Sequence, residues 1–145
     1  MKILTNNRRA YYEYEILEEF EAGLVLVGTE VKSIKEGRVN IKEAYVEIKG
    51  SEAFIVGMHV APYREGNLQN VDPYRERKLL LNRREIKKLH AQVTQAGLTI
   101  VPLKIYVNKK GLVKMEIALA RGKKLYDKRE AQKERDVKRQ LERYL

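Results

Sequence analysis

The chain of 145 residues has no cysteine and no tryptophan, and it has only two histidines, two phenylalanines and three prolines. Without cysteine, disulfide frameworks and thiolate metal sites are excluded, which fits a reducing compartment. No stretch approaches the roughly 18 consecutive apolar residues of a membrane-spanning helix. The opening residues, MKILTNNRRA, lack the apolar core of a secretory signal. We therefore expect a cytoplasmic protein.

Residues that commonly carry catalysis are also scarce. His59 ends a predicted strand and His90 lies beside the apolar stripe of a predicted helix, so packing or surface roles fit both better than general-base roles. Residues 13–21 hold five glutamates, but strand alternation would divide them between two faces and spoil a metal site. No Walker loop or glycine-rich nucleotide fingerprint is present. We expect no enzyme, cofactor or metal; a nuclease using His59 is the catalytic alternative.

Positive charge is what the chain has in excess, with 30 Lys or Arg against 20 Asp or Glu. Residues 121–145 alone carry ten basic against five acidic residues, whereas residues 10–21 carry five Glu and no basic residue. A generic solvated surface would not need this blockwise pattern, although it stays open as an alternative. Several tyrosines stand beside Arg or Lys, a combination that stacks on bases and holds phosphates. The pattern predicts a nucleic-acid partner.

Two hairpins are predicted from alternating apolar and polar positions. Residues 45–49 alternate, Gly50-Ser51 provides a turn, and residues 53–60 return. In the second hairpin Val101, Leu103, Ile105 and Val107 are expected on one face, the chain turns at Gly111, and Val113, Met115, Ile117 and Leu119 share the facing side.

Two helices have recognisable ends. A short helix is expected after Thr29, ending at Gly37. A longer one begins at Asn82, which forms a capping box with Glu85, and ends at Gly97. A third helix is expected within the basic tail, where a narrow apolar stripe falls at helical spacing.

The remaining segments are less regular. Residues 13–20 fit either a strand or a helix, residues 24–27 read as a short buried strand, and residues 61–77 read as a long polar loop. The predicted fold class is mainly β: a small closed antiparallel barrel of the oligonucleotide-binding (OB) type with two or three peripheral helices. Residues 1–120 would form this barrel and residues 121–145 a basic C-terminal tail, helical or disordered until bound.

Five runs of sequence carry a resemblance to one family. The chain resembles the SsrA-binding proteins (small protein B), the bacterial partners of transfer-messenger RNA, over nearly its whole length. The runs are NRRAYYEYEI (residues 7–16), EEFEAGLVLVGTEVKSI (18–34), VNIKEAYV (39–46), RKLLLNRREI (77–86) and ARGKKLYDKRE (120–130). The resemblance implies an OB-type barrel that binds the tRNA-like domain of transfer-messenger RNA. It also implies delivery of that RNA to stalled ribosomes for trans-translation, which frees the ribosome and tags the peptide.

The resemblance also implies roles for particular residues. By position, Asn7, Arg8 and Arg9 would meet the elbow of the RNA, and Glu21 and Leu80 would belong to the same RNA-binding face. Residues of the tail would act in the decoding region and message channel of the small ribosomal subunit: Lys123, Lys124, Asp127, Lys128 and Arg129.

Two tyrosines and one alternative function complete the expectations. Tyr12 and Tyr126 have polar neighbours and are candidates for stacking on bases. The family often shows Arg-His at Tyr11-Tyr12 and His at Tyr126, so stacking is retained while a positive charge is lost.

A general single-stranded nucleic-acid-binding OB protein is the alternative function. The acidic block at residues 13–21 argues against it, because such a block suits a partner of defined shape.

Overall fold

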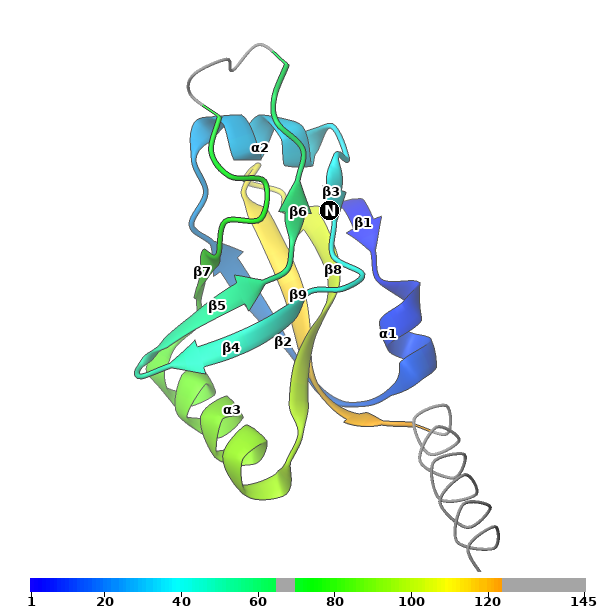
Figure 1. Cartoon of the computed structure of the whole chain (residues 1–145), viewed down its shortest axis with the longest axis vertical. Coiled ribbons are helices and arrows are strands. Elements are labelled where there is room, and N and C mark those ends of the chain that lie inside the picture. The colour runs from blue at the N-terminus through cyan, green and yellow to red at the C-terminus, as the bar shows by residue number, and fades with distance from the viewer. Residues whose placement is uncertain (65–69, 124–145) are drawn as a thin grey trace, which may run out of the picture.

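A computed structural model gives the fold of residues 1–64 and 70–123 (Figure 1). Within these ranges nine strands and three helices follow one another. They are β1 (Lys2–Asn6), α1 (Arg8–Glu13), β2 (Tyr14–Leu24), α2 (Gly28–Lys35), β3 (Val39–Asn40), β4 (Tyr45–Lys49), β5 (Glu52–Val56), β6 (His59–Val60), β7 (Arg77–Leu80), α3 (Arg83–Ala96), β8 (Thr99–Val107) and β9 (Val113–Gly122).

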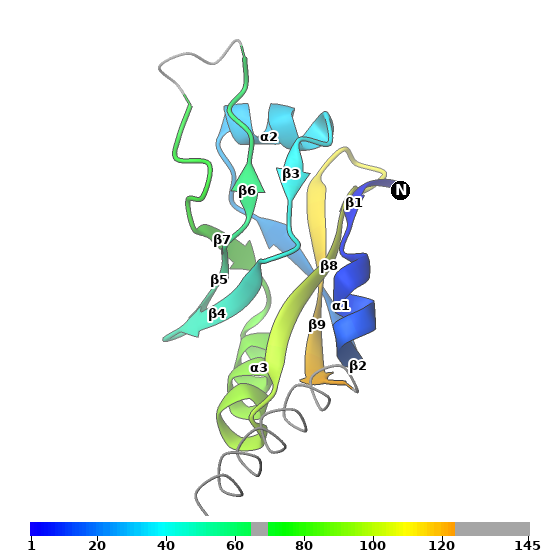
Figure 2. The same ribbon diagram turned by 45° about the vertical axis from the view of Figure 1, so that its right-hand side comes forward.

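Seven strands form one antiparallel sheet in the order β1-β8-β9-β2-β7-β5-β4, while β3 pairs separately with β6. The centre of the sheet is the long β8–β9 hairpin together with β2, which pairs with β9 from Tyr14 to Gly23. The sheet curves so that β4 lies against β8 (Figures 1 and 2). The prediction of a mainly β, antiparallel fold is confirmed.

The predicted closure of this sheet into a barrel is not found. Among the strands of residues 1–64 and 70–123, no hydrogen-bonded pairing joins the edge strands β1 and β4. Strand β1 pairs instead with β8 from Lys104 to Val107. It therefore occupies the edge that a closing strand would need along that half of β8, and β8 contacts β4 without forming a ladder with it.

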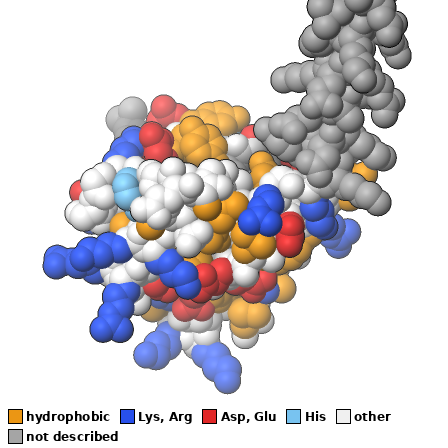
Figure 3. Space-filling view, turned by 90° about the horizontal axis from the view of Figure 1, so that it is seen from below, with side chains coloured by type: hydrophobic (Ala, Val, Ile, Leu, Met, Phe, Trp, Pro, Cys, Tyr) orange, Lys and Arg blue, Asp and Glu red, His pale blue; other side chains and the backbone are white. Residues whose placement is uncertain are grey.

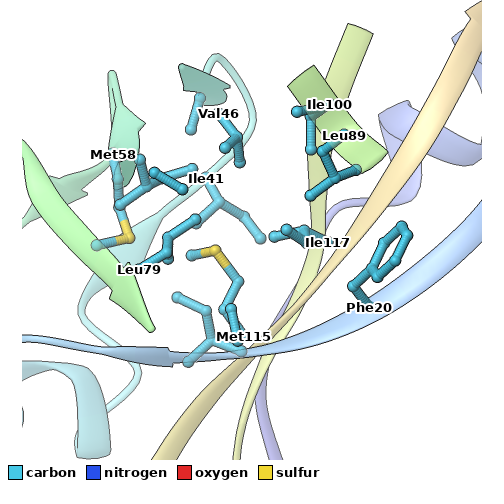
Figure 4. Close-up of a cluster of buried hydrophobic side chains, with 14 of the residues drawn as sticks. Phe20, Ile41, Val46, Met58, Leu79, Leu89, Ile100, Met115 and Ile117 are labelled. Carbon is cyan, nitrogen blue, oxygen red and sulfur yellow. The ribbon is translucent and has the colours of Figure 1, made fainter. Parts of the chain in front are cut away.

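The main core fills the inner side of the curved sheet. Phe20 from β2, Leu79 from β7, Leu89 from α3 and Met115 and Ile117 from β9 are all buried there. Figure 4 shows these side chains pointing toward one another from elements that are far apart in the sequence. The predicted inward face of residues 113–119 is confirmed, because burying one apolar face is what fixes a strand's register.

Strand β8 has two buried faces, and a bulge exchanges them. Ile100 and Ile105 belong to the main core, whereas Val101 and Leu103 are buried on the other side of the sheet. The register shifts between Pro102 and Lys104. The prediction that residues 101–107 keep one face to the core is therefore wrong, because the extra residue of a bulge interrupts strict alternation.

Helix α3 confirms the clearest helix prediction. The Asn82 side chain accepts a hydrogen bond from the Glu85 N–H at 2.9 Å, and the Glu85 carboxylate accepts from the Asn82 N–H at 3.1 Å. Gly97 ends the helix in the left-handed conformation at φ 66°, which a residue without a side chain adopts readily. No helix in the described part of the chain is long and apolar enough to cross a membrane.

Several boundaries near the N-terminus differ from expectation. Residues 13–20 are settled as strand, since they lie almost wholly in β2. The strand expected at residues 24–27 is wrong: β2 ends at Leu24, and Val25 and Val27 are exposed. Strand β1 and helix α1 were not predicted, because a helix of six residues is too short to show a period.

An ion pair buried inside the fold ties α2 to β7. The Arg77 side chain is fully buried, and its Nε donates to Glu30 Oε2 at 2.6 Å. Its other nitrogens donate to the carbonyl oxygens of Met58 at 2.7 Å and Pro73 at 3.1 Å. The guanidinium thus has the partners that a buried charge requires.

The other oxygen of Glu30 fixes the start of α2. It accepts from the Val27 N–H at 3.1 Å and from Arg75. Val27 is therefore the N-cap residue, and the predicted cap at Thr29 is wrong by two positions. Burial raises the pKa of Glu30, but the hydrogen bonds from Arg75, the Val27 N–H and Arg77 together hold that pKa below its usual value.

Candidate nucleic-acid interface

Helix α1 is fastened to the outer side of the sheet by Asn7. The Asn7 side chain is buried, accepts from the Ala10 N–H at 3.3 Å and donates to the carbonyl oxygens of Pro102 at 2.9 Å and Ile41 at 3.4 Å. The family resemblance predicted that Asn7 meets the RNA. In the structure, its side-chain amide forms hydrogen bonds inside the fold. Its effect on a ligand would be indirect, through the placing of α1.

The exposed side chains of α1 point away from this anchor. Ala10 is buried against the sheet, which leaves Arg8 and Tyr12 on the solvent side, and Tyr12 is 68% exposed. Arg9 differs from Arg8 in being paired, to Glu13 at 2.8 Å and to Glu43 at 2.5 Å. A hydrogen bond and charge from Glu13, followed by the charge of Glu43, raise the pKa of Arg9.

Lys123 is brought to the same helix from the far end of the chain. Its Nζ donates to the Tyr11 carbonyl oxygen at 2.8 Å, across 112 residues of sequence. Its backbone N–H donates to the Glu13 carbonyl oxygen at 2.9 Å. A cation that bonds the last carbonyls of a helix satisfies acceptors that the helix leaves open. Two of the sequence motifs therefore meet at the C-terminal end of α1.

Glu21 and Leu80 also lie together. Gly23 of β2 pairs with Leu80 of β7, and Glu21 precedes Gly23 by two positions. All three therefore lie on the face of the sheet opposite the main core. Leu80 is 53% exposed and closely covers Gly23, at which an added Cβ would lie 3.2 Å from the Leu80 Cβ. Beside them is a shallow hollow of about 240 Å³. Its lining includes Leu26, Leu80, Leu112 and Lys114.

A charged strip links Glu21 to α1. Glu21 lies opposite Glu116 of β9, and Glu116 pairs with Lys104 of β8 at 3.1 Å. Burial, followed by the charges of Glu116 and Glu19, raises the pKa of Tyr11, which places this α1 side chain close to the strip. Together these residues form one surface, which we call the outer face. It consists of the exposed side chains of α1, the charged strip, and the neighbourhood of Glu21 and Leu80.

The sequence analysis missed three site residues: Lys104 and Glu116 of the charged strip, and Tyr106 of β8, which lies opposite Lys114 of β9 on the same face of the sheet. The alternation of the hairpin does place Lys104 and Tyr106 opposite its apolar face. Nothing in the sequence, however, indicates that β2 pairs with β9, and this pairing is what brings Glu21 next to them.

The other predicted tail residues, Lys124, Tyr126, Asp127, Lys128 and Arg129, lie outside the described residues. So does nearly all of the predicted tail of residues 121–145, although β9 extends to Gly122, past the predicted boundary of the β domain at residue 120.

A second side of the molecule carries further basic residues. Figure 3 views the structure from below, the side on which α3 lies in Figure 1, and Lys and Arg side chains project from it. Arg83, Arg84 and Lys87 of α3 are exposed, and Lys88 pairs with Glu18 at 2.8 Å.

The two histidines have different surroundings, and neither belongs to the outer face. His59 meets the Tyr74 ring edge-on, with ring centroids 4.9 Å apart, and His90 is an exposed residue of α3. Among residues 1–64 and 70–123, no group of three or more His, Asp or Glu residues is arranged to hold a metal ion.

A curved antiparallel sheet with an exposed face of tyrosine, basic and hydrogen-bonding side chains is typical of β-sheet nucleic-acid-binding proteins. The comparison with known families makes the identification specific. The model of the SmpB protein family matches residues 4–145, so the chain belongs to the SmpB family.

Relatives cover almost the whole chain. The SsrA-binding protein of Thermoanaerobacter pseudethanolicus is 53% identical over 99% of this chain and 92% of its own length. That of Persephonella marina is 55% identical over 97% of this chain and 92% of its own length. A solved structure described as "tmRNA-SmpB: a journey to the center of the bacterial ribosome" is 48% identical, covers 83% of this chain and 84% of its own, and has a TM-score of 0.69.

Proposed function

We propose that this protein binds the tRNA-like domain of transfer-messenger RNA and brings it to stalled ribosomes for trans-translation. The observation that carries the proposal is the match to the SmpB family over residues 4–145. The relatives are named for binding SsrA, and the similar solved structure is described as a tmRNA–SmpB assembly at the ribosome. In this role the protein is an RNA-binding factor of the cytoplasm and not an enzyme.

The outer face supplies the chemistry for such a partner. Arg8, Lys123 and Lys114 offer positive charge for phosphates, and Tyr12 offers an exposed ring on which a base can stack. Glu21 can accept hydrogen bonds from nucleotide amino or hydroxyl groups, which phosphates cannot provide. The residues that bind phosphates and the residue that can select particular nucleotide groups are therefore neighbours on one surface.

The fold gives this surface a rigid support. We propose that the curved sheet functions as an OB-type barrel, with β4 lying against β8 where a closing pair would be. Residues 1–120 would be the RNA-binding domain. Residues 121–145 would be a basic tail in which Lys124, Tyr126, Asp127, Lys128 and Arg129 contact the decoding region and message channel.

A competition experiment tests the proposal. Labelled tRNA-like domain is bound to the full chain and displaced by unlabelled tRNA-like domain or by oligo-dT, at several salt concentrations. We expect displacement by the folded RNA at far lower concentration. We also expect the affinity to fall steeply with salt, by about 0.7–0.9 log units per log unit of salt for each neutralised phosphate. Equal displacement by oligo-dT would support the general single-strand binder instead.

A further inference from the structure

Tyr106 reaches across a whole strand to touch Glu21. Tyr106 lies on β8 opposite Lys114 of β9, while Glu21 lies on β2 opposite Glu116 of β9. The tyrosine side chain therefore spans β9, and its hydroxyl donates a hydrogen bond to Glu21 Oε2. Tyr106 is only 5% exposed. A buried phenol needs a hydrogen-bond partner, and here the partner is an exposed carboxylate.

The other charges on this part of the sheet are already engaged with one another. Lys104 pairs with Glu116, the residue directly across from Glu21. Burial raises the pKa of Glu116, but hydrogen bonds from Glu19 and Lys104 lower it overall, while the hydrogen bond to Glu116 raises the pKa of Glu19. Lys104 is therefore engaged with Glu116 on this part of the sheet.

Glu21 is left with one fixed partner. Among the described residues its side chain has a single side-chain hydrogen bond, from Tyr106, which uses one acceptor position on Oε2. A carboxylate offers about four such positions. The remaining ones lie on the exposed side of the sheet, next to Gly23 and Leu80. Because Tyr106 is held by burial, it restricts the rotamers of a side chain that would otherwise be free, which lowers the entropy lost on binding.

We propose that Tyr106 is a positioning residue for RNA recognition. It holds the Glu21 carboxylate ready to accept a hydrogen bond from a donor group of the RNA, a base amino group or a ribose 2′-hydroxyl. The inference rests on the proposed function, since it concerns how the same face selects its RNA. Because a carboxylate repels phosphate, Tyr106 affects which RNA is selected and does not contribute to binding of the phosphates.

The direct test is Tyr106→Phe, which removes the hydroxyl and keeps the ring. We expect binding of the tRNA-like domain to weaken about five- to tenfold, the usual effect of losing one hydrogen bond. The slope of affinity against salt should be unchanged, because no phosphate contact is lost. The matched control is Tyr45→Phe, which alters a half-exposed tyrosine of β4, and it should leave both quantities unchanged.

A double-mutant cycle separates positioning from general weakening. Glu21→Gln alone should reduce binding, and Tyr106→Phe should have little further effect in the Glu21→Gln protein, because the carboxylate that it positions is gone. Independent, additive effects of the two substitutions would overturn the proposal. So would a changed salt slope in Tyr106→Phe, or unchanged affinity.

A second variant covers the case in which Tyr106→Phe lowers stability. Glu21→Asp keeps the charge but shortens the side chain, so the carboxylate no longer reaches the Tyr106 hydroxyl while the buried ring is untouched. Its binding should weaken with the salt slope retained, and Tyr106→Phe should add nothing to it. Wild-type affinity in Glu21→Asp would contradict the inference. Failure of the wild-type chain to bind tRNA-like RNA would instead contradict the proposed function.

Discussion

Two glutamates, Glu30 and Glu21, show how differently one side chain is used in this protein. Glu30 is 3% exposed, and its two oxygens are taken by Arg75, Arg77 and a backbone N–H. Glu21 is exposed on the outer face and is held at one oxygen by Tyr106. The first carboxylate has its acceptor positions filled from within the fold, whereas the second keeps positions open toward solvent.

This difference indicates which property each residue controls. A buried charge that loses its partner keeps its desolvation cost, so the Glu30–Arg77 pair should govern stability. An exposed carboxylate is solvated in the free protein, so its loss should matter little until a ligand displaces the water. The predictions below compare these two sites, from the largest expected effect to the smallest.

Removing Arg77 should cause the largest loss of stability. Arg77→Met leaves the buried Glu30 without the fully buried one of its two arginine partners, and we expect the free energy of unfolding to fall by about 3–5 kcal/mol. The measurement is urea denaturation followed by circular dichroism. The control is Lys78→Met, which breaks an exposed pair with Glu52 one residue along β7 and should cost about 1 kcal/mol or less. Similar losses in both variants would remove the distinction between the two kinds of site.

Low pH should lower the folding stability of the protein, partly through protonation of Glu30. Because the folded-state pKa of Glu30 is lowered, its contribution to stability is present above the unfolded-state value of about 4.3 and is lost as pH falls through the folded-state value. Unfolding measured from pH 7 to pH 3 should therefore show a smaller acid-induced loss in Glu30→Gln than in the wild type. An equally steep loss in Glu30→Gln would assign the acid sensitivity to other groups; Glu52→Gln is the matched exposed control.

Glu21→Gln should separate binding from stability. Replacing the charged carboxylate with a neutral amide, of which only one oxygen accepts, should weaken binding of the tRNA-like domain by about 1–3 kcal/mol. The urea midpoint should stay close to that of the wild type, since the side chain is exposed. Filter binding and denaturation on the same preparations check both quantities. A large fall in stability would show that Glu21 resembles Glu30 after all.

The smallest effect is expected at the exposed Arg9 pair. Glu43→Gln removes one of two carboxylates that compete with phosphate for Arg9, and the Glu43 side chain is 78% exposed. We expect no measurable change in the urea midpoint and a slight tightening of RNA binding at low salt. Weaker binding would mean that Glu43 orients Arg9 rather than competing for it.

The parts of the fold that were predictable have strong local signals. The β8–β9 hairpin has period-2 alternation around a glycine turn, and α3 has a capping box and a terminal glycine. The misses have physical causes: α1 is too short to show a period, the bulge at Pro102 reverses the faces of β8, and the cap of α2 depends on Arg75 and Arg77 from β7 and the loop before it.

The candidate site, too, has features that could be predicted from the sequence and features that depend on distant contacts. The sequence motifs pointed to Arg8, Glu21, Leu80 and Lys123 through family resemblance, and the structure shows which of them are neighbours. Glu21 and Leu80 meet across β2 and β7, and Lys123 reaches α1. The burial of Asn7 and the contact from Tyr106 could not be read from the chain, since both depend on β8 lying beside distant segments.

The amino-acid sequence by itself determined the antiparallel β class, the helix α3 and the blockwise charge that favours a polyanionic partner, because period, capping and composition are local properties. Only the tertiary structure decided which charges are engaged and which are open. The pairing of β2 with β9 placed Tyr106 over Glu21, and the packing of α2 against β7 enclosed Glu30. These contacts join segments far apart in the chain, so their energies depend on the folded register and not on neighbouring residues.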